Sequence, residues 1–421
     1  MAARSVRRSG PDPDAVSALD DLAGALDQLR CRAARGTHKT RVSLADLAGR
    51  VGIPRSTLHT YVTGRTLPPV EILDRIVIAL GASPTEQAGW ADAWFRVAAH
   101  RHDHQRSIAA VVVEPSGVEA WQIEQICKGA TLFSDWQHIY GGWALREAMR
   151  AELRRAAQLL DQPCPERLRA KLRRAVARFA HATGFSAFDT GDYDQAQRYF
   201  RFGLACAEES GDWHLRAFCL TSMARQAWWL GRADESLTFA EQGLVRADRL
   251  TATERAMLCT ARARALAAMH RDADAIRAVG QADEHFAHST PGDDPPWTVF
   301  YDRAEHCGDT GVALLDLAFR GQWVDQAHAR LTASSTGHLD TRRRSRVLAQ
   351  IQLAALDMAV GDPYKAVTVG MEALDTAQTI RSDRILEALR KLAHHSVRHT
   401  HIPAVSAFRQ RLTTARDDQT A

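Results

Sequence analysis

A period of 40 residues recurs along the second half of this chain. Three stretches share it first, GDYDQAQRYFRFG at 191–203, GRADESLTFAEQG at 231–243 and HRDADAIRAVGQAD at 270–283, and two more restate it, GQWVDQAHARL at 321–331 and GDPYKAVTVGMEA at 361–373. Small residues recur in them at matching positions, for example at Ala196 and Ser236. Such a period is typical of stacked helix pairs, each of which buries its apolar face only against its neighbours. The repeat therefore predicts an α-solenoid.

Helical periodicity also dominates the part of the chain before the repeats. Residues 15–34 place Val16, Leu22 and Leu29 on one stripe, as an amphipathic helix does. We find no alternating run bounded by hairpin turn residues, so an all-α fold is expected. A length of 421 residues exceeds what one hydrophobic core usually supports, so several domains are expected. The expected parts are a disordered N-terminal arm at 1–14, a first domain at 15–100, a linker at 101–117 and a repeat domain at 118–415.

The stretch SLADLAGRVGIPRSTLHTYVTGRTLPP at 43–69 predicts two short helices joined by a tight turn. Ser43 is of the type that caps a helix N-terminus, and Gly52 is of the type that ends a helix. Pro54 fits the first turn of the next helix, where its missing N–H costs nothing. The second helix then runs over 55–63.

This second helix carries hydrogen-bonding side chains on one face. Leu58 and Tyr61 can turn inward, because they lie three residues apart. The opposite stripe consists of polar residues: Arg55, Ser56, His59, Thr60 and Thr63. Such side chains suit the edges of bases in a major groove, which admits one helix. Arg55 stands on the first turn, where recognition helices reach the bases, and it is the best candidate for bidentate recognition of guanine.

Positive charge is concentrated around the same helices. Between Arg30 and Arg65 the chain has eight Arg and Lys residues against one acid, whereas the whole chain has a net charge of +4. Attraction to a polyanion is the usual consequence of such a local excess, and a solvated basic face without a partner is the alternative. Arg4, Arg7 and Arg8 are candidates for an arm in a minor groove, with a disordered tail as the alternative.

Residues 15–95 resemble the helix-turn-helix domain of the lambda-repressor-like, or Xre, family. The resemblance rests on the run LADLAGRVGI-x-x-S-T-L-x-x-Y-x-x-GR-x-x-P, followed by a helix and LGAS. It implies five helices, of which the second crosses the phosphate backbone and the third enters the major groove. The residues that it implies for base or groove contacts are Arg55, Ser56, Thr57, His59 and Thr60. Those that it implies for phosphate contacts are Lys39, Arg41, Ser43 and Arg65.

The repeats resemble tetratricopeptide units, although their period is longer than that of this family, and HEAT-like pairing stays an alternative. The resemblance implies a right-handed α-solenoid whose concave surface, lined by the first helix of each pair, binds peptides or partner segments. The ligand-groove residues that it implies are Arg178, His181, Thr221, Arg225 and Trp228, with Phe188, Ile351, Ala355 and Met358 as further inward positions. Two arginines and a tryptophan would suit a short peptide, and packing residues with solvated arginines are the alternative.

Two further segments resemble parts of actinobacterial regulators that join an Xre domain to such repeats. They are HIYGGWALREAM at 138–149 and PPWTVFYDRAEHCGDTG at 295–311.

Several other classes of protein are not expected. Seven scattered cysteines without a CxxC pair argue against a disulfide framework and a zinc knuckle, and indicate a reduced cytoplasm. The apolar run at 108–113 is far short of the roughly 20 residues that span a bilayer, so no membrane segment is expected. Only His395 and His399 in the histidine clusters at 100–104 and 394–401 have helical pair spacing, so neither metal nor cofactor is expected. The chain has no GxSxG, GxxxxGK[ST] or GxGxxG motif, so we do not expect an enzyme.

These observations favour a cytoplasmic, homodimeric regulator of transcription that binds double-stranded DNA sequence-specifically. Its repeats would bind a peptide, a small ligand or a partner, and would mediate dimerisation. The effector would change the spacing of two DNA-binding heads, because a dimer must meet half-sites about 34 Å apart or a multiple of that. One alternative is a scaffold that binds a partner protein through its repeats without specific DNA binding. Another is a peptide-controlled phosphatase or sequestering protein.

Overall fold

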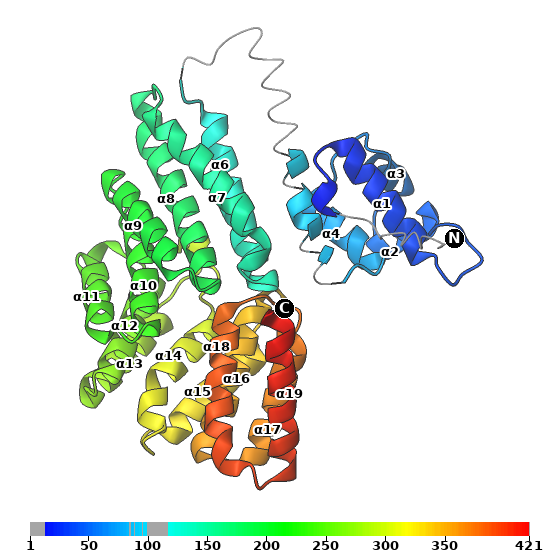
Figure 1. Cartoon of the computed structure of the whole chain (residues 1–421). Helices are drawn as coiled ribbons and strands as arrows, with labels where there is room; N and C mark the ends of the chain where they lie inside the picture. Colours follow the sequence, from blue (N-terminus) through cyan, green and yellow to red (C-terminus); the bar gives the residue numbers. More distant parts are fainter. Residues whose placement is uncertain (1–12, 84–85, 88, 95, 99–116, 421) are drawn as a thin grey trace, which may run out of the picture. The chain divides into compact units, whose positions relative to one another are not determined.

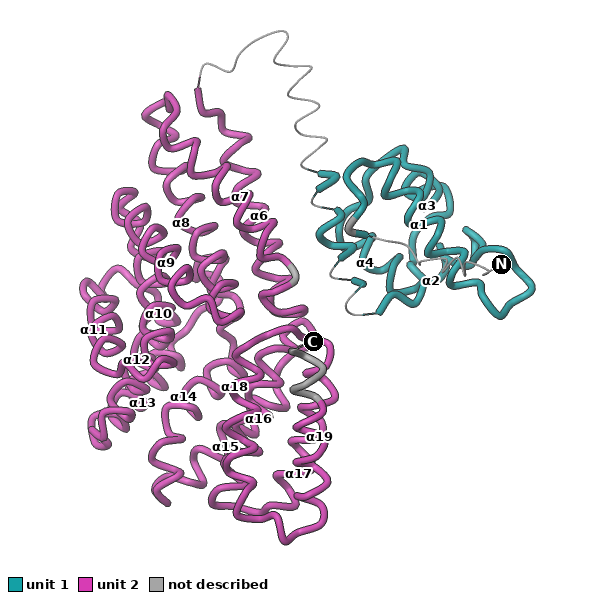
Figure 2. Tube along the Cα trace, viewed as in Figure 1, with its two compact units in different colours: residues 1–116 teal, residues 117–421 magenta. Residues whose placement is uncertain are grey.

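The computed structural model describes residues 13–83, 86–87, 89–94, 96–98 and 117–420 (Figure 1). These residues form α-helices and 3-10 helices and contain no strand, which confirms the all-α prediction. Contacts divide the chain into two units, Met1–Ser116 and Gly117–Ala421 (Figure 2). Within the described ranges, none of the helices combines the length and the apolarity that a bilayer crossing requires.

The N-terminal unit packs short helices around one apolar core. Its helices are α1 (Leu19–Ala33), α2 (Leu44–Val51), α3 (Arg55–Val62) and α4 (Val70–Ala79), followed by helical residues at 86–87, 89–94 and 96–98. Leu26, Leu47, Leu58 and Ile76 each come from a different helix and are fully buried in this core. Trp90 joins them from the helical residues that follow α4. The unit therefore holds α2 and α3 in one fixed geometry.

The first helix begins later than the sequence predicts. A 3-10 turn, η1 (Pro13–Ala15), precedes it, and the helix starts at Leu19 rather than at the expected residue 15. Asp21 explains the new boundary, because its carboxylate accepts hydrogen bonds from the backbone N–H groups of Ser17 and Ala18 at 3.1 and 2.9 Å. These bonds satisfy donors that a helix N-terminus leaves unpaired.

The turn between α2 and α3 follows the local signals in the sequence. Ser43 caps α2 by accepting a hydrogen bond from the N–H of Asp46 at 3.1 Å. Gly52 ends α2 in the left-handed region, with φ of 69°, and Pro54 stands directly before α3. Gly64 ends the turn after α3 with φ of 70°, and an added Cβ there would lie 3.2 Å from the Cβ of Ala23. A glycine is favoured at this position because it adopts positive φ without strain and has no Cβ to meet Ala23.

An ion pair fastens the end of α1 to the start of the last helical segment of this unit. Arg32 donates hydrogen bonds through Nη1 and Nη2 to both carboxylate oxygens of Glu86, and the N–H of Ser83 donates to the same carboxylate at 2.8 Å. The bonds from Arg32 lower the pKa of Glu86 from 4.5 to about 2, and Ser83 adds to this effect against a smaller opposing effect of burial.

Acid should therefore destabilise the N-terminal unit. Because the folded pKa of Glu86 lies below its usual value, the ionised carboxylate stabilises the fold above about pH 4.5. This contribution is lost as the pH falls toward about 2. The pair is partly exposed, so we expect a loss of about 1 kcal/mol in the free energy of unfolding. Urea unfolding between pH 5 and about 2.5 measures it, and a Glu86→Gln protein should lack this part of the pH dependence.

The C-terminal unit starts with α6 (Ala120–Tyr140) and α7 (Arg146–Gln158) and continues as helix pairs (Figure 1). The pairs are α8 (Glu166–Asp189) with α9 (Tyr193–Glu209), α10 (Trp213–Trp229) with α11 (Ala233–Leu244), α12 (Ala252–Ala268) with α13 (Asp272–Ala287), α14 (Arg303–Ala318) with α15 (Val324–Gly337), α16 (Arg343–Val360) with α17 (Pro363–Ala377), and α18 (Asp383–His395) with α19 (Pro403–Thr420). Short 3-10 turns are η2 (Trp143–Leu145), η3 (Leu159–Asp161), η4 (Ala247–Arg249), η5 (Pro296–Thr298), η6 (Asp340–Arg342) and η7 (Ser396–His399). Each pair packs against the next, as an α-solenoid does.

The 40-residue period has a structural origin in the turn within each pair. Gly191, Gly231 and Gly321 lie between the first and second helices of their pairs and have φ of 73°, 74° and 81°. Small residues also allow the two helices to approach. An added Cβ at Gly184 on α8 would lie 2.7 Å from a ring carbon of Phe200 on α9. The repeated glycines therefore mark chain reversals and close helix contacts.

The unit also joins its beginning to its end. Asp189, at the end of α8, is fully buried and accepts hydrogen bonds from the N–H of Gly142 and from Oγ of Ser382, both at 2.9 Å. Nη1 of Arg344 lies 3.5 Å from the same carboxylate. The N–H of Arg381 donates to the carbonyl of Tyr140 at 3.2 Å. We call this junction of α6, α8, α16 and α18 the seam.

Candidate DNA-binding helix and repeat cavity

The outer face of α3 is not covered by the other helices that the structure describes in the N-terminal unit. Arg55, Ser56 and His59 are exposed, whereas Leu58 is fully buried in the core. Tyr61 is half-buried and packs against the same core. Inward and outward stripes therefore follow the helical spacing that the sequence shows.

The threonines of α3 are less free than Arg55. Thr57 and Thr60 are half-buried, and the hydroxyl of Thr60 donates to the carbonyl of Thr57 at 2.8 Å. The hydroxyl of Thr63 likewise donates to the carbonyl of His59 at 2.7 Å. In this conformation both hydroxyls keep lone pairs that can accept a hydrogen bond, but their protons are used within the helix.

The residues that the sequence assigns to phosphate contacts differ in their environments. Lys39 and Arg65 are exposed and make no ion pair with any described residue. Arg41 is exposed but lies 3.2 Å from a carboxylate oxygen of Asp27. Ser43 is half-buried and caps α2, so its Oγ already accepts one hydrogen bond.

A buried arginine holds the loop that carries Lys39 and Arg41. Arg30 on α1 donates to the carbonyl of Val42 through Nε and Nη2, at 3.2 and 2.8 Å. It also pairs with Asp27 at 2.9 Å. The end of the loop is therefore fixed against α1, next to the start of α2.

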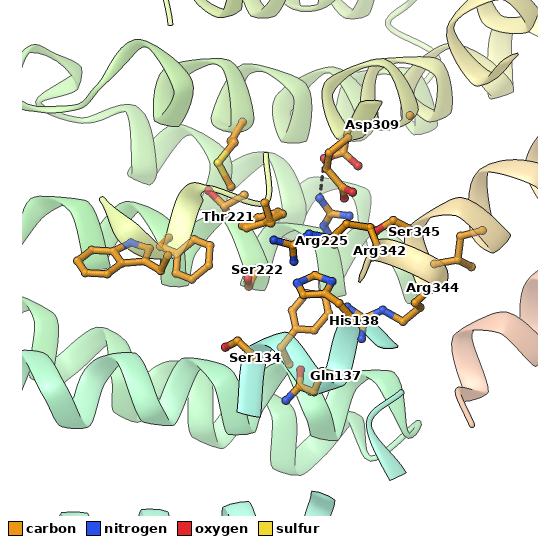
Figure 3. Close-up of a pocket in the computed structure, with 18 of the residues that line it drawn as sticks. Ser134, Gln137, His138, Thr221, Ser222, Arg225, Asp309, Arg342, Arg344 and Ser345 are labelled. Carbon is orange, nitrogen blue, oxygen red and sulfur yellow. Dashed lines mark hydrogen bonds and ion pairs between the residues drawn. The ribbon is translucent and has the colours of Figure 1, made fainter. Parts of the chain in front are cut away.

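The C-terminal unit contains a cavity of about 330 Å³. Most of its wall comes from the first helices of the pairs, α8, α10, α12, α14, α16 and α18. The rest comes from α6, the segment 296–300, the end of α15 and η6. Figure 3 shows part of this wall, with Arg225, Arg342 and Arg344 around the same space as His138. We call this space the repeat cavity. The five groove residues that the sequence implies all line it: Arg178, His181, Thr221, Arg225 and Trp228.

The further inward positions do not line the cavity. Phe188 is fully buried among other aromatic residues, and the guanidinium of Arg384 covers its ring at 4.7 Å. Ile351, Ala355 and Met358 on α16 lie in the core with α17 and α18 instead. The assignments fail on α16 because each residue turns a helix by about 100°, and a shift of one position selects a different face. The residues of α16 that do line the cavity are Arg344, Ser345, Leu348, Ala349 and Gln352.

Several polar residues of the cavity could not be found from the repeat alone. Arg264, Arg344, Arg384 and His338 line it and are almost fully buried. The two segments that resemble parts of known regulators, 138–149 and 295–311, do contribute to the cavity. Their residues that line it include His138, Trp297, Glu305 and Asp309. Nothing in the local sequence distinguishes the buried arginines from the many solvated ones.

One carboxylate in the wall is shared by two arginines. Asp309 lies 2.6 Å from Nη2 of Arg225 and also accepts a hydrogen bond from Nη2 of Arg264. Burial raises the pKa of Asp309, but the two guanidinium groups outweigh it, and the net shift is downward. Asp309 is therefore ionised and compensates one of its two positive partners.

Two histidines of the wall, His138 and His181, are held neutral. Burial, with a smaller effect of Arg178, lowers the pKa of His181 to about 3, and its Nε2 lies 2.7 Å from Oγ of Ser222. Burial also lowers the pKa of His138 well below its usual value, and Arg344, Arg342 and His338 lower it further. Both shifts indicate a wall in which an additional positive charge is unfavourable.

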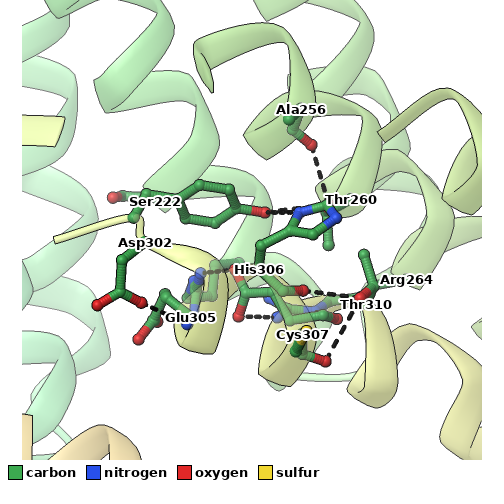
Figure 4. Close-up of polar contacts among 12 residues, drawn as sticks. Ser222, Ala256, Thr260, Arg264, Asp302, Glu305, His306, Cys307 and Thr310 are labelled. Carbon is green, nitrogen blue, oxygen red and sulfur yellow. Dashed lines mark hydrogen bonds and ion pairs between the residues drawn. The ribbon is translucent and has the colours of Figure 1, made fainter. Parts of the chain in front are cut away.

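A chain of hydrogen bonds fixes α14 against α12 behind the cavity (Figure 4). The hydroxyl of Tyr301 lies 3.2 Å from Nδ1 of His306 and 3.3 Å from Oγ1 of Thr260. Nε2 of His306 lies 2.9 Å from Asp283, and Thr310 donates to the carbonyl of His306 at 2.7 Å. Because α14 carries Glu305 and Asp309, this network keeps both acids in place.

The histidine clusters do not form a metal site in the described part of the chain. No group of three or more His, Cys, Asp or Glu residues there is arranged to hold a metal ion. The rings of His394 and His395 lie 5.9 Å apart, centroid to centroid. The cluster at 100–104, the linker at 101–116 and the arginines at 4, 7 and 8 lie outside the described residues.

The comparisons with known proteins concern the N-terminal unit. Residues 21–90 match the family model described as a helix-turn-helix domain. This match spans α1 to α4 and supports a DNA-binding regulator of the helix-turn-helix type. A comparison with curated proteins gave no match.

Proposed function

We propose that this protein is a sequence-specific regulator of transcription that reads duplex DNA with α3 and senses an effector in the repeat cavity. The observation that carries the proposal is the exposed polar face of α3, headed by Arg55, in a unit that matches a helix-turn-helix domain. A guanidinium on the first turn of a recognition helix suits the two acceptors of guanine. Lys39 and Arg65, both exposed, suit the flanking phosphates.

We further propose the Xre subtype for this domain and tetratricopeptide-like repeats for the C-terminal unit. The order of helices and turns at 43–69 supports the first. The second is supported by the spacing of the pairs, because α9, α11 and α13, and again α15, α17 and α19, start 39 or 40 residues apart. Such a regulator acts in the cytoplasm as a homodimer, whose two copies of α3 meet half-sites about 34 Å apart or a multiple of that. An effector that prefers one arrangement of the dimer shifts the population between arrangements.

Salt dependence of duplex binding tests the DNA-binding part of this proposal. We expect the full chain to bind a duplex selected from a random pool, with an affinity that falls steeply as salt rises. Lys39→Gln and Arg65→Gln should each reduce the slope of log affinity against log salt by about one. Fluorescence anisotropy of a labelled duplex measures both quantities.

The matched control is Arg277→Gln, because Arg277 is an exposed arginine of the C-terminal unit with a 70% exposed side chain. This variant should leave the slope unchanged. A chain that binds no duplex even at low salt would contradict the proposal and favour a protein-interaction scaffold.

A further inference from the structure

We infer that the repeat cavity binds a small organic anion with an apolar body, and that its acidic group meets Arg344 and Arg384. This inference rests on the proposal that the C-terminal unit senses an effector, and it specifies the chemical class of that effector.

The first observation is a set of buried hydrogen-bonding atoms without partners. Among the described residues that line the cavity, five such atoms occur, and all of them are nitrogens. They are Nε of Arg384, Nε1 of Trp297, Nδ1 of His138 and of His338, and Nη1 of Arg344, which makes no hydrogen bond although it lies 3.5 Å from the carboxylate of Asp189. Arginine and tryptophan nitrogens can only donate. A buried donor without an acceptor is energetically costly. A ligand that brings hydrogen-bond acceptors into the cavity would therefore be stabilised by these donors.

The second observation is the charge of the wall. Of the described residues that line the cavity, six are arginines and three are acids. Asp309 serves two of those arginines, as described above, and burial raises the pKa of Asp135 above its usual value. Burial also lowers the pKa of Arg384 to about 9, and the positive charges of Arg225 and Arg344 contribute to this against Asp189. Asp189 adds one further acid, which lies 3.5 Å from Nη1 of Arg344. The six arginines of the wall still outnumber these four acids, so part of its positive charge is not compensated.

The third observation is the position of the two arginines that this inference names. The guanidinium carbons of Arg344 and Arg384 lie 5.0 and 5.7 Å from the ring centroid of Phe185. The relative exposures of Arg344 and Arg384 are 3% and 6%. Arg384 stacks on aromatic rings, and its Nε is buried without a hydrogen-bond partner among the described residues. Two guanidinium groups beside one ring can converge on a single carboxylate or phosphate.

The remaining wall sets the character of the rest of the ligand. Phe218, Trp228 and Phe300 line the cavity with Phe185 and offer apolar surface. A volume of about 330 Å³ lies at the small end of the range for sites that hold a compact organic molecule. The ligand that fits is amphipathic, with one acidic group and one apolar body.

An extended peptide fits the wall less well. Each residue of a bound peptide presents a backbone N–H donor and a C=O acceptor. A side-chain amide can bond to both, because it has an acceptor oxygen and a donor NH₂ group. The whole chain contains no asparagine, and the amides in the wall are those of Gln137 and Gln352. Nε2 of Gln137 already donates to the carbonyl of Ala182 at 3.0 Å.

Two fluorescent probes with one skeleton test the inference. They are the anion 8-anilinonaphthalene-1-sulfonate and its neutral parent N-phenyl-1-naphthylamine. We expect the full chain without DNA to bind one sulfonate probe per chain, with a dissociation constant at least about tenfold lower than that of the neutral parent. Arg384→Gln and Arg344→Gln should each raise the dissociation constant for the anion by about tenfold or more and leave that for the neutral parent unchanged.

Arg255→Gln is the matched control, because Nε of Arg255 is also buried without a partner but the residue does not line the cavity. It should bind the anion as the parent does. Equal or tighter binding of the neutral probe, or no binding of the anion, overturns the inference. This comparison needs no variant, so it decides even if the arginine variants do not fold.

Displacement of the bound probe separates the possible occupants. Benzoate and phenyl phosphate should both displace it, and their relative potency tells a carboxylate ligand from a phosphate ligand. Displacement by a capped neutral tetrapeptide, but by neither anion, would assign the cavity to peptides and overturn the inference. If the chain binds no duplex but binds the anion selectively, the proposed regulator is rejected and the anion site is kept. If the chain binds duplex but does not prefer the anion, only the anion site is rejected.

Discussion

An Arg55→Ala protein should bind its selected duplex roughly tenfold to a hundredfold more weakly than the parent, because a bidentate contact to guanine is worth about 1 to 3 kcal/mol of discrimination. The loss should be confined to the selected duplex. Arg55 is exposed at the start of α3 and pairs with no acid among the described residues, so its removal should not disturb the fold. Anisotropy titrations with the selected duplex and a scrambled duplex, at one salt concentration, measure the two affinities.

Arg50→Ala is the control for this prediction. Arg50 is an exposed arginine at the end of α2, and it pairs with Asp46 at 2.8 Å. It should leave the ratio of the two affinities unchanged, because the charge of Arg50 attracts the phosphates of both duplexes alike. An equal loss on both duplexes for Arg55→Ala would show that Arg55 contacts phosphate. An unchanged affinity for the selected duplex would remove Arg55 from the interface.

Asp189→Ala should destabilise the C-terminal unit by about 3 to 5 kcal/mol, the usual cost of removing one member of a buried charged network. Asp189 accepts from Gly142 and Ser382 and faces Arg344, and it is fully buried. Its removal would leave the N–H of Gly142 and the hydroxyl of Ser382 without their acceptor, and would remove the negative charge that faces Arg344. Urea unfolding followed by circular dichroism measures the change, since the C-terminal unit supplies most of the helical signal.

Asp194→Ala controls for the loss of a carboxylate in the same region. Asp194 is exposed in the first turn of α9, so its removal should cost well under about 1 kcal/mol. Asp189→Asn should fall between the two, because the amide oxygen still accepts but the charge that faces Arg344 is gone. If Asp189→Ala unfolds at the same urea concentration as Asp194→Ala, the seam does not contribute to stability.

Local signals in the sequence were sufficient for much of the fold. Ser43, Gly52 and Pro54 each act on their own turn, so the boundaries of α2 and α3 could be predicted from residue type. The helix pairs could be predicted because a glycine such as Gly191 or Gly231 is favoured where the backbone reverses with positive φ, although His270 adopts φ of 58° at the corresponding turn of the next pair.

The polar part of the cavity could not be predicted in the same way. The arginines of α16 and α18 face inward only because of the rotation of each helix in its pair, and this depends on packing rather than on residue type. The contact of Asp189 with Ser382 joins residues 193 positions apart, and no local pattern indicates it. The resemblance to tetratricopeptide repeats correctly assigned Arg178 and Arg225 to the cavity wall. It was wrong at Phe188, whose ring is covered by Arg384.

The seam also limits how this unit can be altered. In an open array of repeats, a helix pair can be deleted or duplicated with a cost confined to its neighbours. Here the helix pairs between α8 and α18 must bring Ser382 within hydrogen-bond distance of Asp189. The number of these pairs is therefore fixed by the contact between the two ends. A deletion of one pair would leave the ends unable to meet, and shortened or extended relatives of this unit should be rare unless their ends are rebuilt together.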